Sequence, residues 1–228
     1  MQAVHFPLGI SAIVIDLDGT MLHTAPELCE AANRMLREMD YAPVSQELLA
    51  SYIGNGISWL VKRALTGDMH ATPDAALFEH AMPIFEKHYT ALLMQSKPFD
   101  GVIEGLDAMK MSGFRLGCIT NKLTRYTDPL LKGAGLAKYF EIVLSGDTLP
   151  EKKPHPLPLL YAAKFFSVPI DKMLLIGDSL SDTVAARAAG CPVFCVPYGY
   201  NHGGPVETLE QDAVINNLPA ALPLIKRV

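Results

Sequence analysis

The chain has 228 residues, with 19 Lys or Arg against 24 Asp or Glu, so its formal net charge is −5. Hydrophobic residues make up 50% and charged residues 19%, a balance that excludes an intrinsically disordered chain. The sequence has no Lys/Arg-rich run and no apolar stretch near the roughly 20 residues of a membrane span. We therefore expect no nucleic-acid or membrane partner. Only four cysteines and no signal-peptide pattern favour a cytoplasmic protein.

Short apolar runs of strand length recur along the chain, beginning with Ile10–Asp16. Their hydrophobicity is continuous rather than alternating, which is typical of strands buried on both faces of a parallel sheet. Helix-like segments lie between the later runs, and this alternation predicts an α/β fold. The further predicted strands are 114–120, 142–145, 174–177 and 193–197, and the predicted helices are 102–111, 124–134, 156–166 and 182–189.

Residues 22–97 differ from the rest, because they contain no comparable strand run. Apolar residues recur there at helical spacing, as Leu28 and Met35 illustrate. We therefore predict an α-helical insertion directly after the first strand. The insertion divides the chain into a helical cap domain, residues 22–97, and an α/β core domain made of residues 1–21 and 98–228.

Two carboxylates, Asp16 and Asp18, follow the first predicted strand and precede Gly19. In open α/β sheets, ligands bind beyond the carboxyl ends of the strands. Carboxylates two positions apart at such an end can project side by side, so that one acts as nucleophile while the other transfers protons. For this string taken alone, an acidic turn with Gly19 at positive φ is the structural alternative.

Groups suited to a phosphate follow two other predicted strands. Thr120 and Asn121 end the second strand, where a hydroxyl and an amide can hold phosphate oxygens, although both residue types are also common helix caps. Lys153 precedes Pro154, whose rigid ring could set an ammonium that neutralises a phosphoryl group. A solvated basic loop is the alternative interpretation of this segment.

Asp178 and Asp182 follow the fourth predicted strand. Residues four apart meet on one face if a helix begins between them. The two carboxylates could then bind or orient a hard divalent cation such as Mg²⁺, which prefers oxygen ligands. The alternative is an aspartate that caps the helix.

The order and placement of these four features resemble the haloacid dehalogenase superfamily over nearly the whole chain. Asp16–Thr20 is similar to its first signature, Thr120 to its second, Lys153 to its third, and Asp178 with Asp182 to its fourth. The resemblance implies a Rossmann-like parallel sheet in the order 5-4-1-2-3. It also implies that the helical insertion is a type 1 cap.

Three strings are also similar to bacterial phosphoglycolate phosphatases: Ile53–Gly56, Ser145–Pro156 and Tyr198–Asn201. This resemblance implies a Mg²⁺-dependent phosphatase whose partner is a small phosphorylated metabolite, with 2-phosphoglycolate as the best candidate. Another sugar or metabolite phosphate, or a phosphomutase reaction, remains an alternative, and a non-catalytic binding module is the alternative outside enzymes. Monomer and homodimer both stay open.

The superfamily resemblance implies a role for each matching residue. Asp16 would attack phosphorus and form an aspartyl-phosphate, and Asp18 would act as general acid and then as general base. The Asp16 carboxylate, the Asp18 backbone carbonyl and Asp178 would bind Mg²⁺, while Asp182 would orient the metal shell or Lys153. The residues expected to bind the phosphoryl oxygens are Thr120, Asn121 and Lys153.

Within the cap, Gly54, Asn55 and Arg63 are the candidate substrate-binding residues. The glycine would let a tight loop approach the site, and the Arg63 guanidinium could pair with a substrate carboxylate. A solvated helix face is the alternative for Arg63. His23 stands where the superfamily usually has an acidic residue near the hinge, which bears on substrate preference more than on catalysis.

Overall fold

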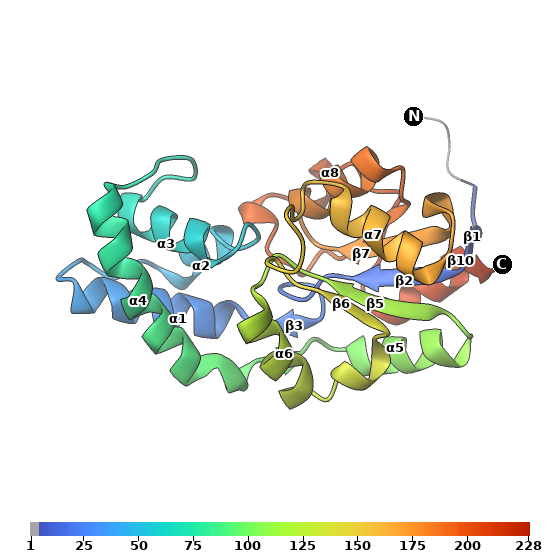
Figure 1. Ribbon diagram of the computed structural model, residues 1–228, viewed down its shortest axis with the longest axis horizontal. Coiled ribbons are helices and arrows are strands. Elements are labelled where there is room, and N and C mark those ends of the chain that lie inside the picture. Colours follow the sequence, from blue (N-terminus) through green and yellow to red (C-terminus); the bar gives the residue numbers. More distant parts are fainter. Residues whose placement is uncertain (1–4) are drawn as a thin grey trace.

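A six-stranded parallel sheet forms the centre of the core domain in the computed structural model, which describes residues 5–228 (Figure 1). Its strand order is β6-β5-β2-β7-β8-β9. Five of these strands stand in the predicted 5-4-1-2-3 order, which is thereby confirmed, and β9 adds an edge strand that was not predicted. The strands are β2 Ala12–Ile15, β5 Arg115–Ile119, β6 Ile142–Leu144, β7 Met173–Gly177, β8 Val193–Cys195 and β9 Ala213–Val214.

Helices cover both faces of this sheet (Figure 1). Successive side chains of a strand point to opposite faces. On β2, Ala12 and Val14 pack in one apolar cluster with α7 and α8, whereas Ile13 and Ile15 pack in the other with α5 and α6. Burial on both faces explains why the strand is apolar throughout. The helices are α5 Val102–Met111, α6 Thr124–Gly133, α7 Leu157–Phe166 and α8 Leu180–Ala189.

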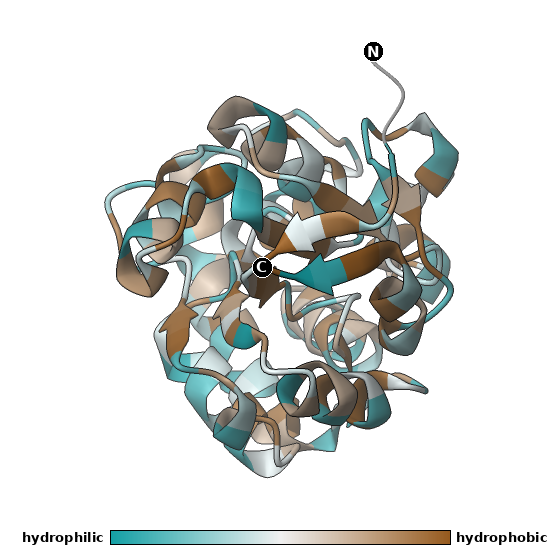
Figure 2. Cartoon of the chain, turned by 90° about the vertical axis from the view of Figure 1, so that its right-hand side faces the viewer, coloured by the Kyte–Doolittle hydropathy of each residue, from teal (hydrophilic) through white to brown (hydrophobic). Residues whose placement is uncertain are grey.

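A small parallel pair, β1 Leu8–Ile10 and β10 Ile225–Arg227, joins the two ends of the described chain (Figure 2). The prediction of a single strand from residue 10 is therefore wrong at its start. The strand is interrupted at Ser11, and Ile10 belongs to β1, which pairs with the C-terminal strand β10. Short 3₁₀ helices fill the connections: η1 Leu93–Gln95, η2 Ala137–Tyr139, η3 Ile170–Lys172, η4 Asn201–Gly203, η5 Val206–Thr208 and η6 Leu218–Leu224.

Four α-helices form the cap, which Figure 1 shows beside the core domain. Two of them, α1 and α4, lie against each other along their length, and their buried faces carry residues such as Met35 and Phe85. The helices are α1 Ala25–Glu38, α2 Gln46–Ser51, α3 Ile57–Thr66 and α4 Ala75–Leu92. None of the helices in residues 5–228 is long and apolar enough to cross a membrane.

The chain enters and leaves the cap through an antiparallel pair of two-residue strands, β3 Leu22–His23 and β4 Lys97–Pro98. This pair places the start of α1 close to the end of β2. The cap therefore connects to the core within a few residues of Asp16 and Asp18.

Candidate active site

Asp16 and Asp18 lie directly beyond β2, with the buried Leu17 between them. Asp16 as a whole is only 8% exposed. Both oxygens of Asp18 accept hydrogen bonds from Lys122 Nζ, at 2.9 and 3.0 Å, and Oδ1 also accepts one from Thr24 Oγ1 at 2.6 Å. The two carboxylates therefore have different partners, although they leave the same strand end.

Asp178 begins the loop after β7, the strand that pairs with β2, so it lies beside Asp16. Asp16, Asp178 and Asp182 each offer a carboxylate oxygen, and these three atoms lie within 4.8 Å of one another. Thr20 Oγ1 donates to Asp178 Oδ1 at 3.0 Å, and the Tyr200 backbone N–H donates to Oδ2 at 2.7 Å. These contacts fix the Asp178 carboxylate toward the strand end of Asp16.

Crowding of buried carboxylates disfavours their charged forms. Burial raises the pKa of Asp16 to about 7, although the Lys153 ammonium opposes this change. Burial, together with the charges of Asp182 and Asp16, raises the pKa of Asp178 well above its ordinary value. A divalent cation among these oxygens would remove the repulsion between them.

The residues present fit a hard cation such as Mg²⁺. The buried Oδ1 of Asp16 receives no hydrogen bond from any residue that the structure describes, although Lys153 Nζ lies 2.9 Å away. Oxygen donors of carboxylates are the ligands that Mg²⁺ prefers. The oxygens of Asp16 and Asp178 could therefore hold a divalent cation at the carboxyl edge of the sheet.

Three oxygen atoms surround the Lys153 ammonium. Its Nζ lies 2.7 Å from Asp182 Oδ1, 2.9 Å from Asp16 Oδ1 and 2.8 Å from the Ile119 carbonyl oxygen. Burial disfavours the ammonium, but the Asp16 and Asp182 carboxylates outweigh it and raise the pKa of Lys153. The side chain thus remains a cation beside Asp16 while being only 2% exposed.

Asp182 is an anchor for this cation and for the loop that carries Asp178. Its Oδ2 accepts hydrogen bonds from the Ser179 backbone N–H at 3.1 Å and from Ser179 Oγ at 2.7 Å. The first of these belongs to a capping box at the start of α8, in which the Ser179 side chain in turn accepts from the Asp182 backbone N–H. Its Oδ1 accepts from Lys153. These contacts support the expected orienting role toward Lys153 more directly than one toward the metal shell.

Thr120 and Asn121 both line the pocket, but their side chains are engaged differently. Thr120 Oγ1 accepts from the Lys122 backbone N–H at 3.2 Å, so its hydroxyl hydrogen is free to donate to a ligand. Asn121 Nδ2 donates to the Lys153 carbonyl at 2.8 Å and to the Gly54 carbonyl at 3.1 Å. In this arrangement the Asn121 amide joins the core to the cap instead of facing a phosphate.

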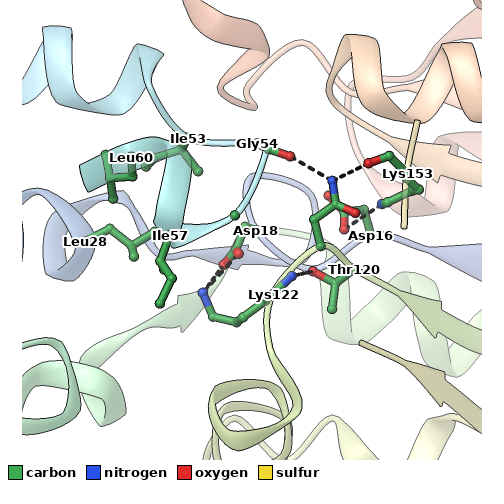
Figure 3. Close-up of a pocket in the computed structure, with 12 residues that line it drawn as sticks. Asp16, Asp18, Leu28, Ile53, Gly54, Ile57, Leu60, Thr120, Lys122 and Lys153 are labelled. Carbon is green, nitrogen blue, oxygen red and sulfur yellow. Dashed lines mark hydrogen bonds and ion pairs between the residues drawn. The ribbon is translucent and has the colours of Figure 1, made fainter. Parts of the chain in front are cut away.

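The pocket lies between the carboxyl edge of the sheet and the cap (Figure 3). The core contributes the carboxylates and lysines, whereas the cap contributes an apolar wall from α1, α3 and the loop before α3. Gly54 and Gly56 bring the backbone of that loop over the site, as expected for Gly54. The apolar cap residues are Leu28, Ile53, Ile57 and Leu60.

Asn55 and Arg63 do not line this pocket. Arg63 is buried, and its guanidinium donates to the Tyr52 carbonyl at 2.8 Å, the Met69 carbonyl at 3.0 Å and Asn55 Oδ1 at 2.8 Å. In this arrangement Arg63 neither faces the pocket, as expected for pairing with a substrate carboxylate, nor lies on a solvated helix face, which was the alternative. The guanidinium instead holds the loop before α3 in place.

Lys122 is a charged site residue that the sequence did not lead us to expect. It is 3% exposed, lines the pocket and binds Asp18. The one feature of the sequence that indicates a place for Lys122 in the site is its position directly after Thr120 and Asn121, beyond the end of a strand. A lysine at the start of a loop is usually solvated, so the sequence alone gave no reason to bury it.

The cap contacts the core through backbone carbonyls of its loops. Besides Asn121 and Gly54, Lys152 Nζ donates to the Asn55 carbonyl at 3.2 Å, and His202 Nδ1 donates to the Ser51 carbonyl at 3.0 Å. His23 lies in β3, one of the two short strands through which the chain enters and leaves the cap, and the centre of its ring lies 5.2 Å from that of Phe99. These contacts between cap and core loops hold the cap over the pocket in this structure.

The family model described as haloacid dehalogenase-like hydrolase matches residues 13–196. The chain belongs to this family. Its relatives among the haloacid dehalogenase-like hydrolases include a phosphoglycolate phosphatase of Thiobacillus denitrificans, 57% identical over 97% of this chain and 98% of its own length. The phosphoglycolate phosphatase of Nitrosospira multiformis is 52% identical over 98% of this chain and 99% of its own length.

Crystal structures of this hydrolase family agree with the fold. The crystal structure of a predicted phosphoglycolate phosphatase from Haemophilus somnus matches with a TM-score of 0.86 and 31% identity, covering 93% of this chain and 96% of that one. Since the matched regions include both domains, the cap and the Rossmann-like core occur together in this relative.

Proposed function

We propose that this hydrolase cleaves small phosphate monoesters through an aspartyl-phosphate on Asp16, with 2-phosphoglycolate as substrate and Mg²⁺ as cofactor. The observation that carries the proposal is the placement of Asp16 between Lys153 and Asp178 at the floor of a capped pocket. The names of full-length relatives at 57% and 52% identity support the choice of substrate.

In the first half-reaction, an Asp16 carboxylate oxygen attacks phosphorus, and the bond from phosphorus to the ester oxygen breaks. Asp18, in its acid form, gives its proton to that oxygen, so glycolate leaves as an alcohol. Lys153 and the Thr120 hydroxyl donate to the phosphoryl oxygens. Phosphoryl transfer depends mainly on such positioning and charge stabilisation.

In the second half-reaction, Asp18 accepts a proton from water as the water oxygen attacks phosphorus. The bond between phosphorus and Asp16 breaks, which restores the Asp16 carboxylate and yields inorganic phosphate. Asp16, Asp178 and the backbone carbonyl of Asp18 would hold Mg²⁺, which supplies positive charge for the phosphoryl oxygens when bound.

Phosphate release from a panel of esters, with Mg²⁺ and with EDTA, tests this proposal. We expect a higher kcat/KM for 2-phosphoglycolate than for hexose phosphates or nucleoside monophosphates. We also expect EDTA to abolish turnover. A hexose phosphate that leads the panel would overturn the substrate assignment, and isomer formation without phosphate release would indicate a mutase instead. Turnover unaffected by EDTA would overturn the assignment of the cofactor.

A further inference from the structure

Lys122 brings a second buried ammonium to the pocket, on the side away from Lys153. Its side chain extends from the core toward the cap and ends beside Asp18, close to Ile57 (Figure 3). Only 1% of this side chain is exposed. The Asp18 carboxylate pairs with this buried cation, and because the ammonium also borders the pocket, a bound anion could share it.

The two pocket lysines differ in the carboxylates that surround them. Lys153 Nζ donates to Asp182 Oδ1 and to the Ile119 carbonyl, and it lies 2.9 Å from Oδ1 of Asp16. Lys122 Nζ makes two hydrogen bonds among the residues that the structure describes, one to each oxygen of Asp18, and the Tyr89 side chain also lies beside it, with its ring centre 5.1 Å away. Lys122 therefore retains capacity for another acceptor.

The position of Lys122 relative to Asp18 defines which part of a substrate it reaches. Under the proposed function, Asp18 contacts the ester oxygen of the leaving group. Lys122 Nζ lies 2.9 Å from Asp18 Oδ1, so it lies next to the atoms that follow the ester oxygen. In 2-phosphoglycolate a carboxylate is attached one carbon beyond this oxygen.

The remaining surface on this side of the pocket offers little to a polyhydroxy leaving group. The cap side chains that line it are Leu28, Ile53, Ile57 and Leu60, all apolar. Buried hydroxyl groups of a sugar would lack hydrogen-bond partners there, which is costly. A compact group with one charge needs only one cation.

We propose that Lys122 binds the carboxylate of the substrate and thereby selects small phosphate esters of hydroxy acids. The inference rests on the proposed phosphatase function and adds the residue that recognises the leaving group. The shared contact with Asp18 places carboxylate recognition directly beside the proton-transfer step.

Two substrates of nearly equal size test this assignment: 2-phosphoglycolate and 2-hydroxyethyl phosphate, in which a neutral hydroxymethyl group replaces the carboxylate. We expect the natural enzyme to prefer 2-phosphoglycolate in kcat/KM. In Lys122→Met, turnover of both esters falls because Asp18 loses its partner, but the preference ratio falls by a further factor of at least about 10, the value of one charged hydrogen bond.

Lys152→Met is the matched control, since Lys152 donates to a cap carbonyl and does not line the pocket. We expect this variant to keep the natural preference ratio, and Lys122→Arg to keep most of it because the charge remains. Equal losses for both esters in Lys122→Met would overturn the proposal and leave Lys122 as a positioning residue for Asp18.

The natural enzyme alone provides a second test, should Lys122→Met fail to fold. Phosphate release from both esters at equal kcat/KM would overturn the role of Lys122 while leaving the phosphatase function intact. A protein that releases phosphate from neither ester would instead contradict the proposed function itself.

Discussion

Gly19 shows how a single residue without a side chain shapes the site. Its φ is +81°, and a Cβ at this position would lie 2.5 Å from Asp178 Oδ2. The backbone of the first signature loop can therefore approach Asp178 only if residue 19 is glycine. The same loop carries Thr20, whose hydroxyl donates to Asp178.

We predict that Gly19→Ala lowers kcat/KM by at least about 100-fold, since a displaced Asp178 impairs charge stabilisation at the reacting phosphate. Gly67 is the matched control: its φ is +68°, and a Cβ there would meet no atom within 4 Å. Gly67→Ala should lose about 1 kcal/mol of stability from backbone strain in the left-handed region and keep its activity. Steady-state kinetics and thermal unfolding of both variants check this, and equal kinetic losses would contradict it.

The raised pKa values of Asp16 and Asp178 predict an unusual pH dependence for the metal-free protein. The pKa of Asp16 is 3.8 in an unfolded chain and about 7 in the folded protein, so its proton binds more tightly to the folded state. This binding contributes fully to stability below pH 3.8, and the contribution is lost as the pH rises to about 7. We therefore expect Tm in EDTA to fall as the pH rises from about 5 to about 7. Saturating Mg²⁺ should remove this fall, because protons and the cation compete for the same oxygens. Identical pH profiles with and without Mg²⁺ would contradict the metal site.

The sequence identified the charged residues of the core more reliably than those of the cap. Asp16, Asp178 and Lys153 follow strands, so the parallel sheet itself brings them to one edge. Arg63 depends on the path of a loop, and its guanidinium turned out to bind backbone carbonyls of the cap. The burial of Lys122 depends on cap residues distant in sequence, which no local pattern reports.

At the level of elements, loops of the cap and of the core meet at the boundary of the pocket. His202, in the loop after β8, donates to the carbonyl of Ser51 at the end of α2. Burial lowers the pKa of His202, so its neutral form, with the hydrogen on Nδ1, suits this contact. One neutral hydrogen bond of this kind contributes about 1 kcal/mol to cap closure.

We predict that His202→Ala raises KM by about 3-fold to 5-fold with a smaller change in kcat, because the closed cap becomes less populated. His88→Ala is the control, since His88 pairs with Glu38 and both residues belong to cap helices. Steady-state kinetics on 2-phosphoglycolate provide the measurement. An unchanged KM in His202→Ala would show that this contact does not hold the cap.

The longer elements of the core could be predicted from sequence to within a few residues, whereas the shortest could not. Predicted helix 102–111 coincides with α5, and predicted strand 142–145 ends one residue beyond β6. The pairs β1–β10 and β3–β4 contain only two or three residues per strand, and each depends on a partner far away in the chain. Hydrophobic periodicity cannot be recognised in such short segments.

At the scale of the whole molecule, one apolar cluster runs from the core into the cap. It includes Ile15 of β2, Leu28 of α1, Phe85 of α4 and Tyr126 of α6. Closing the cap therefore buries apolar surface from both domains, while the carboxylates and lysines stay at the pocket between them. The fold thus encloses the reacting groups in a site from which water can be excluded.

The most direct test of the central claim is to locate the phosphorylated residue. Enzyme quenched during turnover of 2-phosphoglycolate is treated with borohydride, which reduces an aspartyl-phosphate to homoserine, and peptides are sequenced by mass spectrometry. The account predicts homoserine at position 16 in samples with Mg²⁺ and none without substrate. Homoserine at another aspartate, or at none while phosphate is being released, would contradict it.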